Sequence, residues 1–480
     1  MIESMPGLRE VPIASQSIDR LIPLVGEEPV ARLKAKADAA RRQLQGRQLW
    51  NVNSTGRGGG VAEMLHSLMP YVRGLGFDTR WAVIEGTQEF FRITKRLHHA
   101  LHGSRGDGSD LGALQRAVYE AVAQENAARL SEVVRPGDVV LLHDPQTAGM
   151  VPHLMAYGAI VIWRCHVGND KPGPEVDLGW DFLEPYLEKV PLNVFSRQQY
   201  IPECCDHGRS VIVPPSIDPF SPKNQEMSEE TARTILVNTG IIGAPNGAPP
   251  VFTRQDGSPG RVERHADIVR SGRAPAWDAP LIVQVSRWDP LKDPVGVMEG
   301  FVRLLERPFD TNAELVLAGP NVSAISDDPE GKGTLDRVQA AWRELPHDYR
   351  NRVHLACLPM TDGEENAAIV NALQRHATIV VQKSLKEGFG LTVTEAMWKG
   401  RPVVGSAVGG IPDQIEDGVS GLLLADPKDA DEFASALERL LKDEGLRRKL
   451  GDNARECVRE HFLATRHLLQ YGELLERLGG

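Results

Sequence analysis

The sequence lacks the features that would assign it to a membrane, to nucleic acid or to a disulfide framework. No run of about 18 apolar residues occurs, and the opening MIESMPGLRE has no apolar signal core, which predicts a cytoplasmic protein without a membrane partner. The formal charge of −11 argues against a nucleic-acid partner, which would need a basic surface. The five cysteines have no paired metal-binding spacing, and their odd number favours a reducing compartment.

Further absences narrow the chemistry. The chain has no Gly-x-x-x-x-Gly-Lys-Ser/Thr phosphate loop, and its 6% of aromatic residues is few for an open groove that holds a long glucan. The acidic pair Asp327–Asp328 has no ligand spacing, so we expect neither a metal site nor a required cofactor. A glycoside hydrolase would need two facing carboxylates, and no such pair can be identified.

What the chain does contain is an alternation of short apolar strands and helical stretches, spread over 480 residues. That length exceeds one ordinary core, and the alternation implies parallel sheets covered on both faces. We therefore predict an α/β protein with two Rossmann-like, doubly wound domains that face a central cleft. The predicted strands are 49–53, 79–84, 139–142, 159–163, 193–195 and 211–213 in the first domain, and 281–285, 314–318, 353–356, 379–382 and 403–404 in the second.

The composition changes between about 216 and 278, after a Pro-Pro-Ser-Ile-Asp-Pro linker signal. We place the first domain at 1–220 and the second at 221–457, with a C-terminal helix at about 458–480 that packs back on the first domain. Residues 243–278 are rich in Gly, Pro, Arg and Asp and have little apolar periodicity. This segment is predicted to be an irregular loop, and the sequence assigns it no role.

A glycine cluster, Gly56 to Gly60, follows the first strand and leads into a helix. Glycines let backbone amides approach a diphosphate, and a helix N-terminus favours the anion. Val61 replaces the third glycine of the dinucleotide fingerprint, yet Glu85 ends the next strand as a ribose-binding acid would. An NAD-dependent oxidoreductase therefore stands as an alternative.

Two cations stand after the first strand of the second domain. Arg287 and Lys292 lie in the strand-to-helix loop, and Asp293–Pro294 has the pattern of a helix cap followed by proline in the first helical position. Ligands of α/β sheets bind outside the carboxyl ends of the strands, so we expect both cations to face the cleft. They would suit a leaving diphosphate.

The most informative local pattern is the segment 383–397. Glu387 lies in a glycine-broken loop after a strand, and Glu395 lies in the helix predicted at about 392–399. A loop carboxylate beside exposed amides can hold sugar hydroxyls, whereas the helix carboxylate can accept a hydrogen bond from a ribose. Polar clusters also follow two strands of the first domain, and we expect them to bind an acceptor's hydroxyls unless the histidines are only structural: His143-Asp144-Pro145-Gln146 and Arg164-Cys165-His166.

The pair Glu387-x7-Glu395, with Arg287 and Lys292, resembles the family 4 retaining glycosyltransferases of the GT-B fold. The first-domain motifs sharpen this resemblance to the trehalose glycosyltransferring synthases within that family, from about residue 20 to the C-terminus. The motifs include Asn53-Ser54-Thr55, Gly58-Gly59-Gly60-Val61-Ala62-Glu63, His143-Asp144-Pro145-Gln146, Trp163-Arg164-Cys165-His166, Pro214-Pro215-Ser216-Ile217-Asp218-Pro219, Gln382-Lys383-Ser384, Asp327-Asp328-Pro329-Glu330-Gly331 and Phe462-Leu463 with Arg466-His467-Leu468.

The resemblance implies an enzyme that makes trehalose reversibly from NDP-glucose and free glucose, with retention at the anomeric carbon and release of NDP. Its implied catalytic residues are Arg287 and Lys292 at the diphosphate and Glu387 at the donor glucose. On the donor side it adds Gly58, Gly59 and Gly60 near the phosphates, Gly388, Phe389, Gly390 and Leu391 at the glucose, Glu395 at the ribose, and Leu358 and Lys383 at the base. On the acceptor side it implies Asn53, His143, Asp144, Gln146, Arg164 and His166.

Other functions remain open from the sequence. They are another retaining transfer such as a sucrose-type synthase, a trehalose phosphorylase, the oxidoreductase, and a noncatalytic sugar-binding protein. The sequence does not choose between UDP-glucose and ADP-glucose as donor, nor between a monomer and a homodimer.

Overall fold

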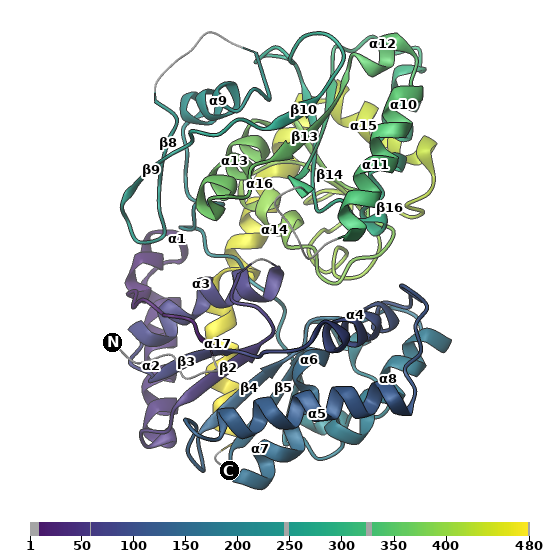
Figure 1. The fold of residues 1–480 in the computed structure, drawn as a ribbon. Helices are drawn as coiled ribbons and strands as arrows, with labels where there is room; N and C mark the ends of the chain where they lie inside the picture. The colour runs from purple at the N-terminus through teal and green to yellow at the C-terminus, as the bar shows by residue number, and fades with distance from the viewer. Residues whose placement is uncertain (1–8, 58, 244–248, 323–328, 479–480) are drawn as a thin grey trace. The chain divides into compact units, whose positions relative to one another are not determined.

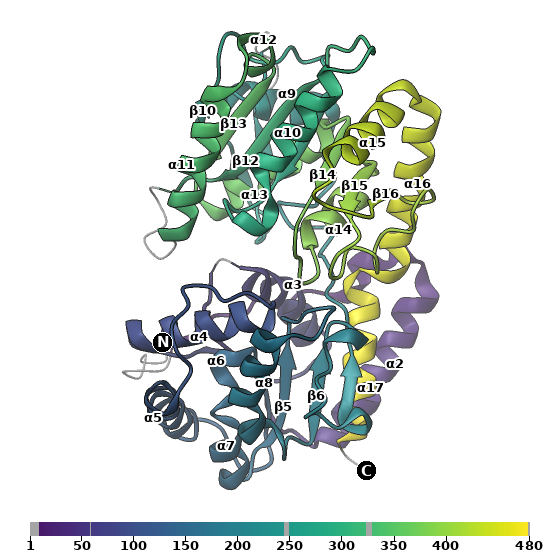
Figure 2. The same ribbon diagram turned by 90° about the vertical axis from the view of Figure 1, so that its right-hand side faces the viewer.

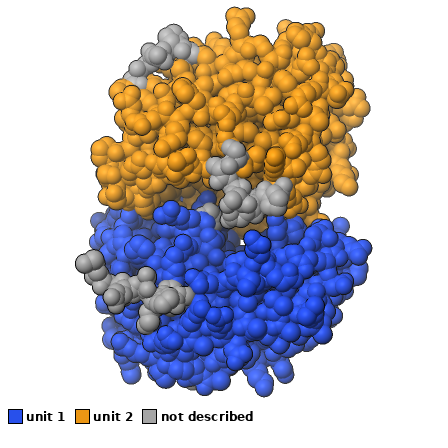
Figure 3. Space-filling view, viewed as in Figure 1, with its two compact units in different colours: residues 1–216, 462–480 blue, residues 217–461 orange. Residues whose placement is uncertain are grey.

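The computed structural model describes residues 9–57, 59–243, 249–322 and 329–478. The chain divides into two compact units, which Figure 3 colours separately. Unit 1 consists of Met1–Ser216 together with Phe462–Gly480, and unit 2 is Ile217–His461. The boundaries predicted from the sequence lie at 220/221 and 457/458. Both units are Rossmann-like α/β domains, so the predicted fold class is confirmed.

Unit 1 is built on a seven-stranded sheet (Figure 1). Neighbouring strands are parallel, except that β1 runs antiparallel to β3. Alternate residues of a strand pack on opposite faces: Val140 and Leu142 enter one core cluster, and Val139 and Leu141 enter the other. The strands, in spatial order, are β1 (Arg9–Glu10), β3 (Thr79–Val83), β2 (Leu49–Asn53), β4 (Val139–His143), β5 (Ile160–Cys165), β6 (Leu192–Phe195) and β7 (Ser210–Ile212).

Helices cover both faces of this sheet, which is why its strands read as nearly continuous apolar runs (Figures 1 and 2). They are η1 (Ile18–Leu21), α1 (Ile22–Val25), α2 (Glu27–Leu44), α3 (Gly60–Gly74), α4 (Gln88–Leu101), α5 (Ala113–Leu130), α6 (Pro145–Ala148), α7 (Val151–Tyr157), α8 (Pro174–Leu187), η2 (Gln198–Tyr200), η3 (His207–Arg209) and the C-terminal α17 (Ala464–Arg477).

The C-terminal helix α17 completes unit 1 and runs beside α2 in both views (Figures 1 and 2). A fully buried arginine of β5, Arg164, attaches it. The guanidinium group donates to Nε2 of His467 at 3.1 Å, to the carbonyl oxygen of Val213 at 3.1 Å, and to the hydroxyl of Tyr471. Because Nε2 of His467 accepts, its Nδ1 carries the proton and donates to Ser216 Oγ at 2.9 Å.

Unit 2 has a second seven-stranded sheet, with parallel neighbours except where β10 runs antiparallel to β13. Its strands, in spatial order, are β10 (Asp267–Val269), β13 (Val353–Leu358), β12 (Glu314–Pro320), β11 (Leu281–Val285), β14 (Ile379–Gln382), β15 (Val403–Ser406) and β16 (Leu422–Leu424). The accompanying helices are α9 (Glu229–Asn238), η4 (Pro290–Lys292), α10 (Pro294–Leu305), α11 (Pro329–Glu344), α12 (His347–Arg350), α13 (Gly363–His376), α14 (Leu391–Trp398), α15 (Ala430–Lys442) and α16 (Glu444–His461).

The predicted start of α10 is confirmed. The Asp293 carboxylate accepts from the backbone N–H of Gly296 at 3.2 Å, and Pro294 takes the first helical position. Asp293 itself has a left-handed backbone, with φ of 52°. The helix therefore begins where the sequence places it, directly after the loop that carries Arg287 and Lys292.

The prediction of an irregular loop over 243–278 is wrong for the described part of that segment. It contains the hairpin β8 (Val251–Thr253) with β9 (Pro259–Arg261), and strand β10 at the sheet edge. Ionic contacts with the start of α13 hold it: Arg254 pairs with Asp362 at 2.8 Å and with Glu364 at 2.9 Å. These strands have only three residues each and are held by ionic contacts and backbone pairing. The sequence therefore shows no apolar periodicity that would reveal them.

Within the described ranges, no helix is both long enough and apolar enough to cross a membrane.

The attachment of α17 gives a first prediction. Replacing Arg164 by Met leaves His467, Tyr471 and a backbone carbonyl without their buried donor, at a cost of about 3 kcal/mol. Hydrogen-exchange protection of α17 should therefore fall roughly 100-fold. Arg32→Ala is the matched control, because Arg32 on α2 reaches Glu473 of α17 at 4.0 Å with 69% of its side chain exposed. Equal protection of α17 in both variants would contradict the assignment.

Candidate active site

In unit 2 the three predicted catalytic residues follow two neighbouring strands, β11 and β14. These strands are parallel, with Ile282 opposite Ile379, so the loops that follow them leave the sheet at the same edge. The first loop carries Arg287 and Lys292, and the second carries Glu387. Strand pairing therefore brings together residues that lie about a hundred positions apart in the sequence.

The centre of this edge is an ion pair between Lys292 and Glu387. Lys292 Nζ lies 2.5 Å from Glu387 Oε2, and the two side chains are 15% and 10% exposed. The same carboxylate oxygen accepts from Ser384 Oγ at 3.1 Å and lies 3.4 Å from Gln382 Nε2. A half-buried cation and carboxylate thus stand together, fixed by polar groups at the end of β14.

Arg287 stands apart from that pair. Its side chain is 64% exposed and contacts Asp289 at 3.3 Å. An exposed guanidinium on the loop of Lys292 is accessible to an anion in solution, whereas Lys292 is already neutralised by Glu387. The two predicted phosphate ligands therefore contact different carboxylates in this structure: Arg287 contacts Asp289, and Lys292 contacts Glu387.

Two predicted base contacts are buried. The ammonium group of Lys383 lies against the carboxylate of Asp293, the cap of α10, and the residue is 1% exposed. Leu358 is 2% exposed, and its carbonyl oxygen accepts from the Asn321 N–H at 2.9 Å. The Lys383 side chain thus pairs with Asp293 at the helix start, and the place of this region at the nucleotide base stays a prediction.

The loop from Glu387 to Gly390 packs against a glycine pair that the sequence analysis missed. A Cβ on Gly409 would approach the carbonyl oxygen of Glu387 to 1.7 Å, and the Gly410 N–H donates to the Gly388 carbonyl oxygen at 3.0 Å. Gly390 takes the left-handed conformation, with φ of 88°, and starts α14. Only glycine fits at 409, and the signal that could have revealed this is the Gly-Gly pair just after the strand 403–404.

The remaining predicted donor residues lie in α14 or directly before it. Phe389 is buried, and Leu391 is the first residue of the helix. Glu395 is 3% exposed, and its Oε1 lies 3.4 Å from Nζ of Lys223, a partner that the sequence analysis did not identify. Lys399 lies one turn on, where burial lowers its pKa to about 7. Glu395 is therefore buried beside two lysines, Lys223 and Lys399.

In unit 1 the glycine loop follows β2, as predicted. Asn53 shapes it: its Oδ1 accepts from Trp81 Nε1 at 2.8 Å, and its Nδ2 donates to the Thr55 carbonyl oxygen at 2.7 Å. Asn53 is buried, so its amide is occupied by the loop rather than presented to an acceptor. Gly59, with φ of 79°, and Gly60 begin α3, and Gly58 lies outside the described residues.

The acid on which the oxidoreductase alternative depends has another partner. Glu85 Oε2 lies 3.1 Å from Arg129 Nη1, and the Glu85 N–H donates to Asn126 Oδ1 at 2.9 Å. The residue thus joins the end of β3 to α5. The structure gives this alternative no further support.

Three of the predicted acceptor residues meet at the ends of β4 and β5. His143 Nδ1 lies 3.1 Å from His166 Nε2, and the two rings are nearly parallel, at 12°. The Asp144 carboxylate accepts from the His166 N–H at 2.7 Å, and Asp144 has a left-handed φ of 65°. Burial lowers the pKa of both imidazoles well below the ordinary value and raises the pKa of Asp144 to about 7.

Gln146 and Arg164 differ in what they offer a ligand. The Oε1 atom of Gln146 is buried and has no hydrogen-bond partner within the described ranges, so it can still accept from a hydroxyl group. The Arg164 guanidinium is engaged with α17, which corrects its predicted place among the acceptor groups. Along a strand, successive side chains point to opposite faces, and the sequence motif does not show which face an arginine takes.

Comparison with known proteins places these features in context. Residues 51–202 match the family described as trehalose synthase, N-terminal domain, and residues 270–457 match the glycosyl transferases group 1. A trehalose synthase of Pyrococcus horikoshii is 35% identical over 99% of this chain and 100% of its own length. A trehalose phosphorylase of Pleurotus pulmonarius is 28% identical over 85% of this chain and 54% of its own length.

Solved structures agree on the fold. An α,α-trehalose-phosphate synthase from Burkholderia xenovorans, in complex with glucose-6-phosphate, superimposes with a TM-score of 0.65 at 17% sequence identity. The match covers 90% of this chain and 100% of that one. The chain therefore has the two-domain GT-B architecture of these proteins.

The raised pKa of Asp144 gives a second prediction. Its folded-state pKa of about 7 exceeds that of an unfolded aspartate, so the unfolded chain ionises first as the pH rises. The stability of the unaltered protein should therefore fall, relative to Asp144→Asn, by up to about 1.4 kcal/mol per pH unit between pH 4 and 7. Urea denaturation of both proteins across this range measures the difference. A constant difference would show that Asp144 ionises normally in the folded state.

Proposed function

We propose, because the chain belongs to the trehalose synthase family, that it transfers glucose from a nucleotide-glucose donor to free glucose and forms trehalose. The enzyme class, a glycosyltransferase of GT-B fold, follows from the relatives and the fold. The observation that supports the donor most directly is the Lys292–Glu387 pair, with the exposed Arg287 on the same loop. The transfer is proposed to be reversible and to retain the donor's anomeric configuration.

Charge development explains the donor side. Breaking the bond between glucose and the diphosphate leaves negative charge on the phosphate oxygens, and fixed positive groups aimed at that charge are the largest expected catalytic contribution. Lys292 and Arg287 supply two cations, and the amides from Gly388 to Leu391 at the start of α14 add the positive end of a helix. Glu387, held next to Lys292, accepts from a hydroxyl group of the donor glucose.

The proposed transfer requires no nucleophilic side chain of the protein, and its protons balance without one. The departing phosphate oxygen takes the proton of the acceptor hydroxyl as the new bond between the two sugars forms. NDP leaves with that proton, and both atoms and charge balance. The proposed reaction uses no metal and no cofactor, because Lys292, Arg287 and the helix amides already supply the positive field.

The acceptor side depends on unit 1. Gln146 presents an unpartnered acceptor oxygen, and His166 and Asp144 lie at the neighbouring strand end. Short polar groups of this kind suit one compact, hydroxyl-rich ring. The proposed acceptor is therefore free glucose, and the product is the α,α-1,1 disaccharide.

A second candidate is phosphorolysis of trehalose. The similarity to the Pleurotus pulmonarius phosphorylase favours it, because the same cations that hold a diphosphate could hold inorganic phosphate. The two candidates differ in the nucleophile that releases glucose from trehalose: NDP in the first and phosphate in the second.

A third prediction concerns the phosphate clamp, the pair of cations Arg287 and Lys292 that is proposed to hold the diphosphate. Charge-assisted hydrogen bonds are worth roughly 1.5–3 kcal/mol each, so Lys292→Ala and Arg287→Ala should each lower kcat/KM by about 10- to 150-fold. Arg303→Ala is the control, because Arg303 lies on α10 with 56% of its side chain exposed and pairs with Glu306. If both clamp variants kept the kcat/KM of the control, the diphosphate would have to bind elsewhere.

A fourth prediction identifies the product. Incubation with UDP-glucose or ADP-glucose and ¹³C-glucose should yield trehalose labelled in one ring, together with one NDP per disaccharide, as read by NMR. The reverse incubation, of trehalose with NDP, should regenerate NDP-glucose. Release of glucose 1-phosphate from trehalose and phosphate, without any transfer from NDP-glucose, would establish phosphorolysis instead. Formation of sucrose or maltose would retain the donor site and overturn the acceptor.

A further inference from the structure

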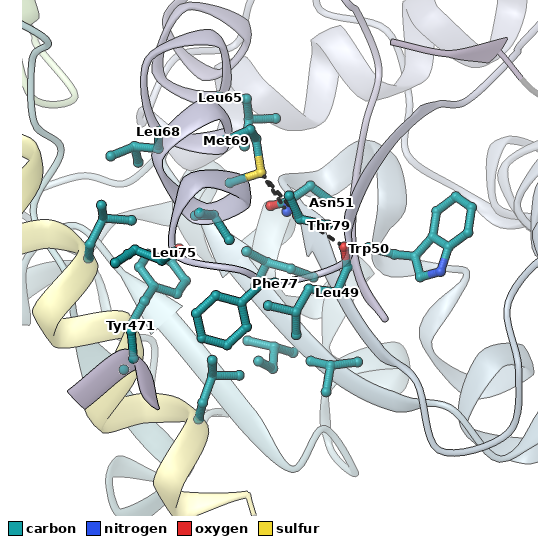
Figure 4. Close-up of a pocket in the computed structure, with 18 of the residues that line it drawn as sticks. Leu49, Trp50, Asn51, Leu65, Leu68, Met69, Leu75, Phe77, Thr79 and Tyr471 are labelled. Carbon is teal, nitrogen blue, oxygen red and sulfur yellow. Dashed lines mark hydrogen bonds between the residues drawn. The ribbon is translucent and has the colours of Figure 1, made fainter. Parts of the chain in front are cut away.

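A buried amide lies in the core of unit 1, among mostly apolar side chains. Asn51 sits in the middle of β2 and is 5% exposed, at the border of a cavity of about 80 Å³. Apolar side chains of β2, α2, α3 and α17 line most of this cavity (Figure 4). Burying an amide costs free energy unless its hydrogen bonds are satisfied, so the partners of Asn51 reveal what it does.

One partner of Asn51 is a thioether. Asn51 Nδ2 lies 3.1 Å from the sulfur of Met69 on α3, as the dashed line in Figure 4 shows. A thioether sulfur accepts hydrogen bonds but has no proton to donate. The nitrogen of the amide must therefore face Met69, and its oxygen must face the opposite way.

The other partner of Asn51 is an imidazole. Asn51 Oδ1 lies 3.1 Å from His143 Nε2. The amide oxygen can only accept, so Nε2 of His143 carries the proton. Both His143 and His166 are neutral near pH 7, because burial lowers their pKa values well below the ordinary one. A neutral imidazole has one N–H, and Nδ1 of His143 is therefore an acceptor.

The position of the proton on His143 determines the position of the proton on His166. Its Nε2 lies 3.1 Å from Nδ1 of His143, and it must supply the proton of that hydrogen bond. Nδ1 of His166 is consequently left with a lone pair. Across the described ranges, no group donates to this atom, and His166 is only half-buried.

We infer that Met69 and Asn51 are positioning residues that fix the tautomer of His166, so that its Nδ1 accepts a hydrogen bond from a hydroxyl group of the acceptor sugar. The chain Met69–Asn51–His143–His166 lies wholly in unit 1. The identity of the sugar rests on the proposed function. The direction of the hydrogen bonds rests on the thioether of Met69, which can only accept, and on the neutral state of the two buried imidazoles.

Met69→Leu tests this inference with little change in volume. Without the sulfur, the Asn51 amide can turn over and donate to His143 Nε2, which reverses each later hydrogen bond. A fraction of His166 then carries its proton on Nδ1 and cannot accept from a hydroxyl. Met64→Leu is the matched control, because Met64 lies on the same helix and lines the same cavity, and its sulfur makes no hydrogen bond among the described residues.

The primary measurement is the tautomer itself. ¹⁵N-histidine NMR of the full chain, with His166 assigned by its loss in His166→Gln, should show an unprotonated Nδ1 in the unaltered protein and in Met64→Leu. In Met69→Leu the signals should shift toward a protonated Nδ1. A protonated Nδ1 in the unaltered protein, or the same tautomer in all three proteins, would overturn the inference.

The second measurement compares the KM for glucose with the Kd for NDP. In Met69→Leu the KM for glucose should rise between about two- and tenfold, the equivalent of one neutral hydrogen bond, while the Kd for NDP stays constant. A change in NDP affinity equal to the change in KM would mark a merely structural defect and overturn the inference. If the unaltered protein formed no trehalose, the proposed function would fail, whereas the NMR result would still decide the tautomer.

Discussion

The parallel register of neighbouring strands is the constraint on which the candidate site depends. In a parallel sheet every strand ends at the same edge, and each loop leaves there before a helix returns across a face. In unit 2 this places the loop after β11 against the loop after β14, and with them a cation and a carboxylate. In unit 1 the pairing of β4 with β5 brings His143 beside the residues that precede His166. Backbone hydrogen bonds thus set the position of groups whose side chains contribute little to the sheet.

The parts of this structure that a sequence can predict are those with local signals. Strand β11, the cap at Asp293 and the helix that begins near Thr392 each depend on a few adjacent residues, and each occurs as predicted. Strands β10 and β16, of three residues each, were missed, because so short a strand shows no period; the equally short β7 was predicted from the apolar run at 211–213. Each takes its place at an edge of the sheet by pairing with one neighbouring strand: β10 pairs with β13, and β16 pairs with β15.

The site residues also divide into those with a local sequence signal and those without one. The loops that carry Lys292 and Glu387 could be found from glycines, caps and strand ends. The partners of Arg164 and Lys383 could not, because His467 lies about three hundred residues from Arg164 and Asp293 lies ninety from Lys383. A basic residue after a strand can face solvent or support the fold, and only burial distinguishes the two: Arg287 is exposed, whereas Arg164 is fully buried.

The discontinuity of unit 1 affects the order in which the chain can fold during synthesis. Unit 2 is one continuous stretch, so all of its strands are available once residue 461 has been made. Unit 1 waits for its last helix, because the buried guanidinium of β5 has no complete set of acceptors until residue 471 has left the ribosome. The first half of the protein to be translated is therefore the last to be finished, and a chain truncated before α17 would expose an apolar face of the first sheet to chaperones and proteases.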